Sequence, residues 1–293
     1  MSRLNKVKGY IYVALSAAVF GCMPLMAVNI YADGVNSMSL VMLRSFLAMP
    51  VFLVLAIIKK VDLRIKPAEL LKACLVFMMG SAVTPVLLFS SYNYISTGTA
   101  TTLHFVYPAL VVVGCALLFK EPTGKVQWFC ALLCCVGGMM FCSFDGSFNF
   151  FGAGLAAVSG LTYAAYMIGL EKSGASDMNP LKYCFYGSLS CGIMMAVITT
   201  ATGSLRLPQS AKGWALSAFF AIMVMLVAVM FFQIGVGFIG SQRAAILSTF
   251  EPITGTVVGA LVFGEPFGIK SAIGTAAILS SVVLLAVFDK TKQ

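Results

Sequence analysis

Three ionisable residues lie well inside long apolar segments of this sequence: Arg44, His104 and Glu251. A charged group near the centre of a membrane-spanning helix costs roughly 2.5–3.5 kcal/mol on insertion scales, so it usually faces a cavity or a partner. Glu251 stands near the middle of the apolar segment 241–263. We interpret it as a proton site or a contact for an amine. The alternative is a protonated or ion-paired carboxyl that ties two helices together.

Two prolines follow polar residues at equivalent points of separate segments, in the pairs Tyr107-Pro108 and Glu251-Pro252. A proline inside a helix removes one backbone hydrogen bond and clashes with the carbonyl four residues earlier. The sequence therefore predicts a helix kink at each proline, with a loosened backbone beside it. Within hydrocarbon, such a break is tolerated only against protein or a wet cavity.

Helical spacing adds two residues to this candidate cavity. His104 shares a helical face with Tyr107, and Ser248 shares one with Glu251. We expect these four side chains to face one water-accessible space. The alternative is a packing kink at which small residues let two helices approach each other.

Other segments contribute polar and aromatic residues that the same cavity could use. The further candidates are Ser16, Phe20, Tyr92, Tyr163, Tyr166 and Gln233. An aromatic stripe at helical spacing is more often packing than a ligand contact, so these residues are predicted as a set and not singly. Arg44 has three interpretations: it binds an anionic group, it pairs with Glu251, or its long side chain reaches toward water at the membrane surface.

The composition indicates that these segments lie in lipid. Hydrophobic residues make up 60% of the 293 residues and charged residues 10%, against about 25% charged in a typical soluble domain. Ten apolar segments approach the length of about 20 residues that a span needs. They are 8–31, 38–58, 69–92, 98–119, 126–143, 150–171, 179–201, 212–235, 241–263 and 268–288. We therefore predict an all-α integral membrane protein with ten transmembrane helices.

The same inventory disfavours several classes of protein. The net charge of +9 does not indicate nucleic-acid binding, because the basic residues collect at the ends of apolar segments. The nine cysteines lie mostly inside apolar runs and are interpreted as small buried hydrophobes. His104 is the only histidine, which excludes a paired-histidine metal site, and no P-loop is present for ATP. We expect no cofactor and no metal.

The chain contains an internal repeat. The stretch 94–124 aligns without a gap with 238–268, and 11 of the 31 positions are identical. Nearer the front of each half, Ser16, Phe20 and Asn36 match Ser159, Tyr163 and Asn179. Five spans in each half would place the two halves in opposite senses across the membrane, as in transporters built from inverted repeats. We predict two inverted five-helix repeats, residues 1–145 and 146–293.

Lysine and arginine indicate the orientation. With the N-terminus in the cytoplasm, 15 of the 19 basic residues lie on the cytoplasmic side, three lie outside, and Arg44 lies within a span. The positive-inside rule therefore favours cytoplasmic N- and C-termini, in a multi-pass protein of the plasma or inner membrane.

Three stretches carry a resemblance to the EamA-type drug/metabolite transporters. They are YNYISTGTATTLHFVYPALVVVGCALLFKEPTGK, VGFIGSQRAAILSTFEPITGTVVGALVFGEPFG and LVMLRSFLAMP, which contains Arg44. The resemblance implies a central cavity lined chiefly by the first, third, fourth, sixth, eighth and ninth spans, with the fifth and tenth at the periphery. It also implies transport of amino acids, other metabolites or toxic organic compounds, often outward. The halves are chemically unequal, because Tyr107 matches Glu251, and His104 is not transferred from the family.

We therefore expect a secondary transporter, and not an enzyme, that exports a small metabolite such as an amino acid by alternating access around a midplane cavity. An uptake permease for a heterocyclic nutrient is the alternative within transport. An intramembrane lipid-modifying enzyme is disfavoured, because His104 has no evident nucleophile partner. A purely structural subunit would leave Glu251 and the paired kinks unexplained. The expected partners are a small-molecule substrate, the lipid bilayer and protons as the candidate coupling ion, with the protein a monomer or homodimer.

Overall fold

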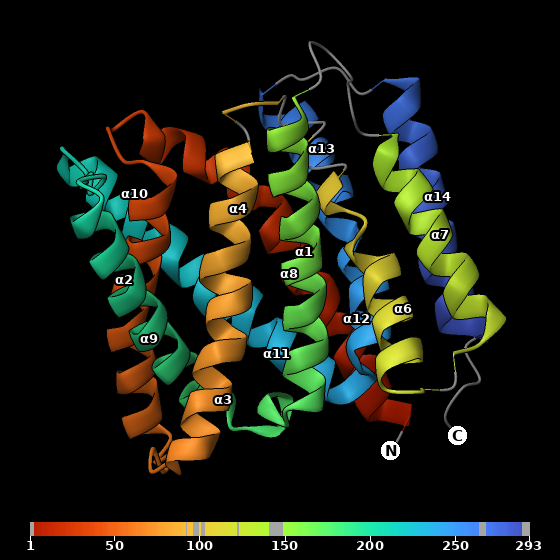
Figure 1. The fold of residues 1–293 in the computed structure, drawn as a ribbon, viewed down its shortest axis with the longest axis horizontal. Coiled ribbons are helices and arrows are strands. Elements are labelled where there is room, and N and C mark those ends of the chain that lie inside the picture. Colours follow the sequence, from red (N-terminus) through yellow and green to blue (C-terminus); the bar gives the residue numbers. More distant parts are fainter. Residues whose placement is uncertain are drawn as a thin grey trace.

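The computed structural model describes residues 3–91, 93–95, 100, 103–121, 123–140, 149–263 and 268–288. Within these ranges every regular element is helical and there is no strand (Figure 1). The apolar helices confirm the predicted class, an all-α membrane protein.

The described elements of the first half are α1 Arg3–Tyr31, α2 Ser37–Ile58, α3 Pro67–Met78, the π-helical η1 Met79–Val83, α4 Thr84–Ser91, α6 Tyr107–Leu118 and α7 Lys125–Met139. Those of the second half are α8 Phe150–Lys172, the 3₁₀ turn η2 Ala175–Asp177, α9 Pro180–Ala201, α10 Ala211–Ala221, the π-helical η3 Ile222–Val229, α11 Met230–Ile239, α12 Ser241–Ser248, α13 Phe250–Phe263 and α14 Ile269–Phe288.

Six continuous helical stretches of the described chain are long and apolar enough to cross a membrane. Four are α1, α2, α8 and α9. The other two are composite: α3, η1 and α4 form Pro67–Ser91, and α10, η3 and α11 form Ala211–Ile239. The shorter apolar helices α6, α7 and α14, and the consecutive pair α12 and α13, lie in the remaining predicted segments.

Asparagine caps account for one match between the two halves. Asn36 Oδ1 accepts from the Ser39 N–H at 2.8 Å at the start of α2, and Asn179 Oδ1 accepts from the Leu181 N–H at 3.1 Å at the start of α9. An asparagine in this place satisfies an N–H group that has no partner within its own helix. The second long helix of each half therefore begins with the same device.

A π-helical segment interrupts the third long helix of each half, at η1 and at η3. Such segments are rare in α-helices and often occur at functional sites, because their wider turn displaces backbone and side chains. At the first of them, Thr84 Oγ1 donates to the Met79 carbonyl at 2.9 Å. Neither segment was predicted, because a run of apolar residues has no pattern that distinguishes a π turn from an α turn.

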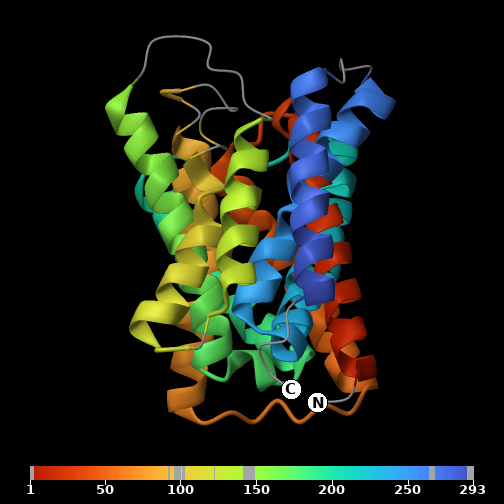
Figure 2. The same cartoon turned by 90° about the vertical axis from the view of Figure 1, so that its right-hand side faces the viewer.

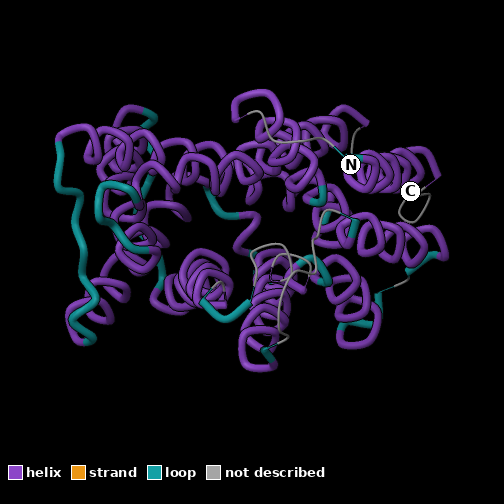
Figure 3. The backbone as a smooth tube through the Cα atoms, turned by 90° about the horizontal axis from the view of Figure 1, so that it is seen from above, coloured by secondary structure: helices purple, strands orange, loops and turns teal. Residues whose placement is uncertain are grey.

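The helices form an elongated bundle when viewed end-on (Figure 3). α1 packs against α11 and α13, and α8 packs against α4 and α6, so the first helix of each half contacts the other half. α7 and α14 pack together at one edge (Figure 1). The start of α1 and the end of α14 lie at the same end of the bundle (Figure 2); we call it the N-terminal end.

Candidate functional site

A central cavity of about 70 Å³ brings Arg44, His104 and Glu251 together; the first two are buried and Glu251 is partly buried. Its lining comes from α1, α2, the η1 and α4 stretch, His104, α8, η3 and α13. The polar and aromatic members are Phe20, Arg44, Ser81, Thr84, Phe89, His104, Tyr163, Tyr166 and Glu251. The volume is room for only a few water molecules, so a larger solute requires the surrounding helices to move apart.

Arg44 lies on α2 and is 3% exposed. Its Nη2 donates to the Ser81 carbonyl in η1 at 2.7 Å, and its Nη1 donates to Met23 Sδ at 3.7 Å. Its Nε has no hydrogen-bond partner. The guanidinium is therefore held inside the bundle, and among the described residues it makes no ion pair with Glu251. A guanidinium carries five N–H donors, so part of the donor capacity of Arg44 is not used by the protein.

Glu251 lies in the first turn of α13, directly after a break in the helix. α12 ends at Ser248, and Thr249 makes a tight turn whose N–H donates to the Ile246 carbonyl at 3.3 Å. No described residue forms a hydrogen bond or ion pair with the Glu251 carboxyl. A carboxyl in the first turn of a helix lies near the positive end of the helix dipole, which favours its charged form.

The predicted kinks take the form of helix breaks. Residues 105–106 form a turn before α6 begins at Tyr107, so Pro108 lies in the first helical turn. Pro252 likewise lies in the first turn of α13. A proline in the first turn loses no helical hydrogen bond, because the N–H groups there have no intrahelical partner. The two breaks fall at equivalent points of the repeat, and the residues beside them, His104 and Glu251, line the cavity.

An aromatic layer forms one wall of the site. The ring centroids of Tyr163 and Tyr166 lie 5.8 Å apart in a stacked arrangement, and both rings line the cavity. Tyr107 lies behind this layer: it is fully buried, and its ring meets that of Tyr163 edge-on at 4.9 Å. Tyr107 is therefore close to the site without lining it.

Glycines allow the helices that carry the site to approach closely. A Cβ atom on Gly160 of α8 would lie 2.7 Å from the His104 carbonyl oxygen. A Cβ atom on Gly21 of α1 would overlap the Glu251 carbonyl oxygen. Larger residues at these two positions would push the segments bearing His104 and Glu251 away from the cavity.

Besides Tyr107, three predicted residues lie outside the cavity lining, and backbone carbonyls take their hydrogen-bond donors. Ser16 Oγ donates to the Ala228 carbonyl at 2.8 Å, and Ser248 Oγ donates to the Ala244 carbonyl at 2.8 Å. Gln233 Nε2 donates to three carbonyls in the η2 region, those of Ala175, Ser176 and Met178. Ser16 and Gln233 thereby link distant segments, whereas Ser248 bonds within its own helix, α12. Tyr92 lies outside the described residues.

Sequence reasoning missed the contribution of the π-helical segments to the lining. Gly80 and Ser81 of η1 and Val229 of η3 all line the cavity. The only available signal was Gly80-Ser81, a pair of small residues inside an otherwise apolar stretch. A Cβ atom on Gly80 would lie 2.5 Å from the Tyr166 ring, so the glycine leaves room for the aromatic wall.

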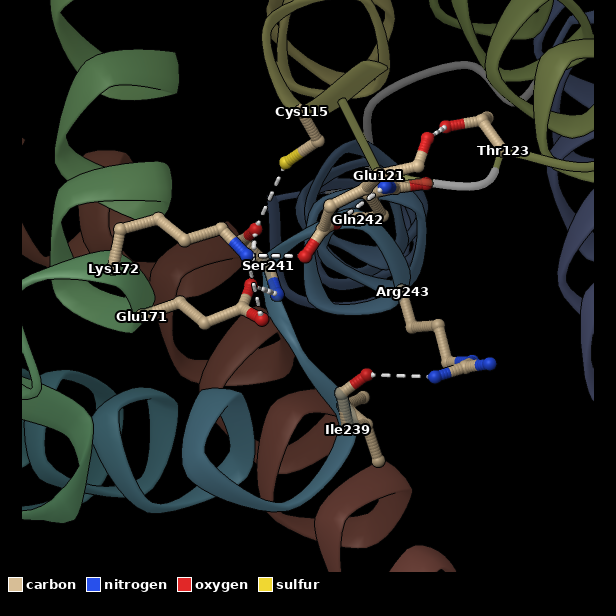
Figure 4. Close-up of polar contacts among 9 residues, drawn as sticks. All are labelled: Cys115, Glu121, Thr123, Glu171, Lys172, Ile239, Ser241, Gln242 and Arg243. Atoms are coloured by element: carbon tan, nitrogen blue, oxygen red, sulfur yellow. Dashed lines mark hydrogen bonds and ion pairs between the residues drawn. The ribbon is translucent and has the colours of Figure 1, made fainter. Parts of the chain in front are cut away.

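Figure 4 shows a second polar cluster, around the end of α8 and the start of α12. Lys172 Nζ pairs with Glu121 and contacts Glu171 at 3.4 Å, and Gln242 Nε2 donates to Glu121 Oε2 at 2.9 Å. Glu171 Oε2 also accepts from the N–H and the hydroxyl of Ser241, each at 2.6 Å. This cluster joins α6, α8 and α12, which belong to different halves. A nearby cavity of about 470 Å³ is larger than the central one. It does not include Arg44, His104 or Glu251, so chemistry and not volume makes the central cavity the candidate site.

Comparison with known proteins supplies the family. The EamA-like transporter family matches residues 7–143 and again residues 150–287. A Bacillus subtilis protein named as an uncharacterized transporter, YcbK, is 25% identical over 283 residues, which cover 92% of this chain and 90% of that protein. The uncharacterized inner membrane transporter YicL of Salmonella typhimurium is 24% identical, with 97% of each chain covered. One solved crystal structure has the same fold, with a TM-score of 0.79 and 16% identity over 97% of this chain and 98% of its own. Two successive matches to one family, over nearly the whole length, confirm the resemblance seen in the sequence: the chain belongs to the EamA-like transporter family.

Proposed function

We propose that this transporter exports a small zwitterionic metabolite, an amino acid with an apolar side chain, by alternating access around the central cavity. The observation that carries the proposal is that Arg44 and Glu251 line one buried cavity without pairing with each other. Uncompensated charges are expensive in a membrane interior. A substrate with a carboxylate and an ammonium group would compensate both charges at once.

Each part of such a substrate has a complementary partner in the lining. Arg44 would bind the carboxylate, since a guanidinium donates two parallel hydrogen bonds to one carboxylate. Glu251 would bind the ammonium group. Tyr163, Tyr166 and Phe20 would contact the apolar side chain, because their rings offer area and little competing polarity.

Alternating access is supported by the construction of the site. Discontinuous helices at a repeat interface are common at the substrate sites of secondary transporters, and rocking of the two halves exposes such a site to each side in turn. The breaks before Tyr107 and Phe250 provide this discontinuity in both halves. Export is the direction that the family resemblance favours, and protons are the proposed coupling ion, with Glu251 as their carrier.

The test uses three compounds of one shape in proteoliposomes: leucine, 3-methylbutylamine without the carboxylate, and 4-methylpentanoate without the amine. We expect counterflow of labelled leucine and little competition by either truncated compound. A panel of other amino acids and metabolites, with and without a pH gradient, then defines substrate range and coupling. Protein-free liposomes are the control. Equal transport of the amine or the acid, or no transport of any amino acid, would contradict the proposal.

An uptake permease for a heterocyclic nutrient is the second candidate function. It is favoured by the stacked rings of Tyr163 and Tyr166, which could take up a flat ring between the cavity walls. It does not use the opposed charges of Arg44 and Glu251. Uncharged purines and pyrimidines in the same counterflow assay distinguish the two functions, because only this candidate predicts that they outcompete leucine.

A further inference from the structure

His104 is held by a single serine on a neighbouring helix. Its Nδ1 lies 2.9 Å from Ser159 Oγ, and both residues are buried. Ser159 Oγ also lies 2.6 Å from the carbonyl oxygen of Ala156, one turn earlier in α8. Gly160, next to the serine, allows α8 to pack directly on the His104 carbonyl.

The hydrogens in this chain of contacts can be assigned from its chemistry. A serine hydroxyl has one proton, and a carbonyl oxygen can only accept. We assign the Ser159 hydrogen to Ala156 O, which is the shorter of the two contacts, so that a lone pair of the hydroxyl faces His104 Nδ1. Nδ1 must then carry a hydrogen and donate it. In the neutral imidazole the other nitrogen, Nε2, has no hydrogen and is an acceptor.

Nε2 has no hydrogen-bond partner among the described residues, although His104 lines the cavity that Glu251 also lines. We infer that Ser159 is a positioning residue: it holds His104 with the hydrogen on Nδ1, so that Nε2 and the Glu251 carboxylate together accept hydrogens from a primary ammonium group of the substrate. This inference rests on the proposed function and narrows it, because the amine must carry at least two N–H hydrogens that can be directed to different acceptors.

The repeat-related pair of residues does not form this arrangement. Ser16 is the repeat counterpart of Ser159, and Ser248 is the counterpart of His104. Ser16 donates to Ala228 and Ser248 donates to Ala244, so each of these serines is used within the protein. The amine-binding pole is therefore built from His104 of the first repeat and Glu251 of the second, and it is not duplicated.

The chain offers a direct test, because His104 is its only histidine. Labelling histidine with ¹⁵N gives two ring nitrogen resonances, and the nitrogen that carries hydrogen is well separated in chemical shift from the one that does not. In the wild-type protein we expect hydrogen on Nδ1 and none on Nε2. Hydrogen on Nε2 alone, or on both nitrogens, overturns the inference.

Transport measurements add a readout of function. Ser159→Ala removes the acceptor for Nδ1 and should mix the two tautomers, raising KM for leucine roughly 3- to 10-fold, the worth of one hydrogen bond. Ser159→Thr keeps a hydroxyl and should restore both the spectrum and KM. Ser188→Ala is the matched control, because Ser188 is buried with no hydrogen-bond partner. N,N-dimethylleucine, with one N–H hydrogen, should compete poorly with leucine.

The proposed function and the positioning role of Ser159 can be disproved separately. If the wild-type protein transports no amino acid, the proposed function fails whatever the tautomer. If leucine is transported but Ser159→Ala leaves both the nitrogen spectrum and KM unchanged, or dimethylleucine competes as well as leucine, the positioning role of Ser159 is wrong. Should Ser159→Ala not fold, the wild-type spectrum, the Ser159→Thr variant and the dimethylleucine competition still decide.

Discussion

Glu251 is the residue on which the proposed mechanism depends most. It lies in the first turn of α13, lines the central cavity and has no hydrogen-bond partner among the described residues. Burial disfavours the charged carboxylate, whereas the start of the helix and a bound ammonium group favour it. A group balanced between these effects can carry a proton in one state of the cycle and bind a cationic amine in the other.

Glu251→Gln keeps the size of the side chain and cannot titrate. We expect the variant to fold, to lose transport driven by a pH gradient, and to retain part of its counterflow exchange. Proteoliposomes with an imposed pH gradient, compared with gradient-free counterflow, measure the two activities. Glu69→Gln, in the exposed first turn of α3, is the control. If transport by Glu251→Gln responds to the pH gradient as the wild-type protein does, Glu251 does not carry the coupling proton. The protein would then be better described as a facilitator.

Arg44 should determine whether the substrate needs a carboxylate. Arg44→Lys keeps the charge but loses the planar fork, so it cannot hold both the Ser81 carbonyl and a carboxylate in the same geometry. A charge-assisted hydrogen bond is worth about 1.5–3 kcal/mol, so KM for leucine should rise roughly 10- to 100-fold. Inhibition by 3-methylbutylamine, measured in the same vesicles, should change little. An equal loss of affinity for leucine and for 3-methylbutylamine would mean that Arg44 supports only the fold.

The sequence indicates which residues are of interest by their type, but it does not indicate which way each side chain points. Arg44, His104 and Glu251 could be selected because ionisable groups in an apolar run need an explanation, and the structure gathers them around one cavity. Ser16 and Gln233 were selected on the same polarity, yet they bond to backbone carbonyls of distant segments. Such tertiary partners leave no mark in the spacing of residues, so polarity alone could not separate the two groups.

At the scale of helices, α12 depends on a cap supplied by another helix. The residue before it is Gly240, with φ of +80°, which offers no side chain to the first N–H groups. Glu171 at the end of α8 provides the acceptor for Ser241, and its partner Lys172 pairs with Glu121 after α6 (Figure 4). An N-cap is worth about 0.5–2 kcal/mol.

Glu171→Ala should therefore lower the thermal unfolding midpoint in detergent by a few degrees, since about 1 kcal/mol corresponds to roughly 2–4 °C for a chain of 150–250 residues. Glu171→Gln, which keeps an acceptor oxygen, should lose less. Glu69→Ala, which removes an exposed glutamate from the first turn of α3, should lower the midpoint less, because it loses only a solvent-screened interaction with the helix dipole. Equal midpoints for Glu171→Ala and the wild type would show that water replaces the cap without loss.

The loop between α1 and α2 is tied to the start of α10 by Asp33. Its Oδ2 accepts from the N–H groups of Gln209 and Ser210 at 2.9 and 3.1 Å. Hydrogen bonds from Ser210, the side chain first, and from the Gln209 backbone lower the pKa of Asp33 below its ordinary value of 3.8. Because the folded-state pKa is lowered, the stabilisation is fully present above pH 3.8 and is lost as the pH falls through the folded value.

Asp33→Asn tests this pH dependence. The wild-type protein should have the higher unfolding midpoint at neutral pH, and its advantage over Asp33→Asn should be constant down to about pH 4 and shrink below pH 3.8. Midpoints of both proteins are compared across that range in one detergent. A difference between the two proteins that does not change with pH would exclude the carboxylate charge as its cause.

The helices themselves were largely predictable, whereas their interruptions were not. Apolar length placed the long helices, and the two prolines correctly marked where α6 and α13 are disturbed. The disturbance is a break that puts each proline in a first helical turn, where it costs little. The choice between a kink and a break depends on whether neighbours such as α8 leave room for the turn, and a one-dimensional pattern does not contain that information.

At the scale of the molecule, basic residues are more numerous at one end of the bundle than at the other. Lys59, Lys60, Arg64 and Lys66 lie in the link between α2 and α3, at the N-terminal end (Figure 2). At that same end lie the starts of α1 and α12 and the link between α6 and α7. Arg206 and Lys212 lie at the other end, near the start of α10. Basic residues are retained on the cytoplasmic side during insertion and are attracted there to anionic lipid.

We therefore predict that the N-terminal end is cytoplasmic. A fluorescent reporter that matures only in the cytoplasm, fused after Gln293, should be active, and a phosphatase that folds only outside the cytoplasm should be inactive at the same position. Truncation after Gly203, in the link between α9 and α10, should reverse the result. As an independent measure, a cysteine at Asp62, in a background without native cysteines, should react with an impermeant thiol reagent only after the cells are permeabilised. Phosphatase activity after Gln293, or labelling of position 62 in intact cells, would place the positive end outside and overturn this orientation.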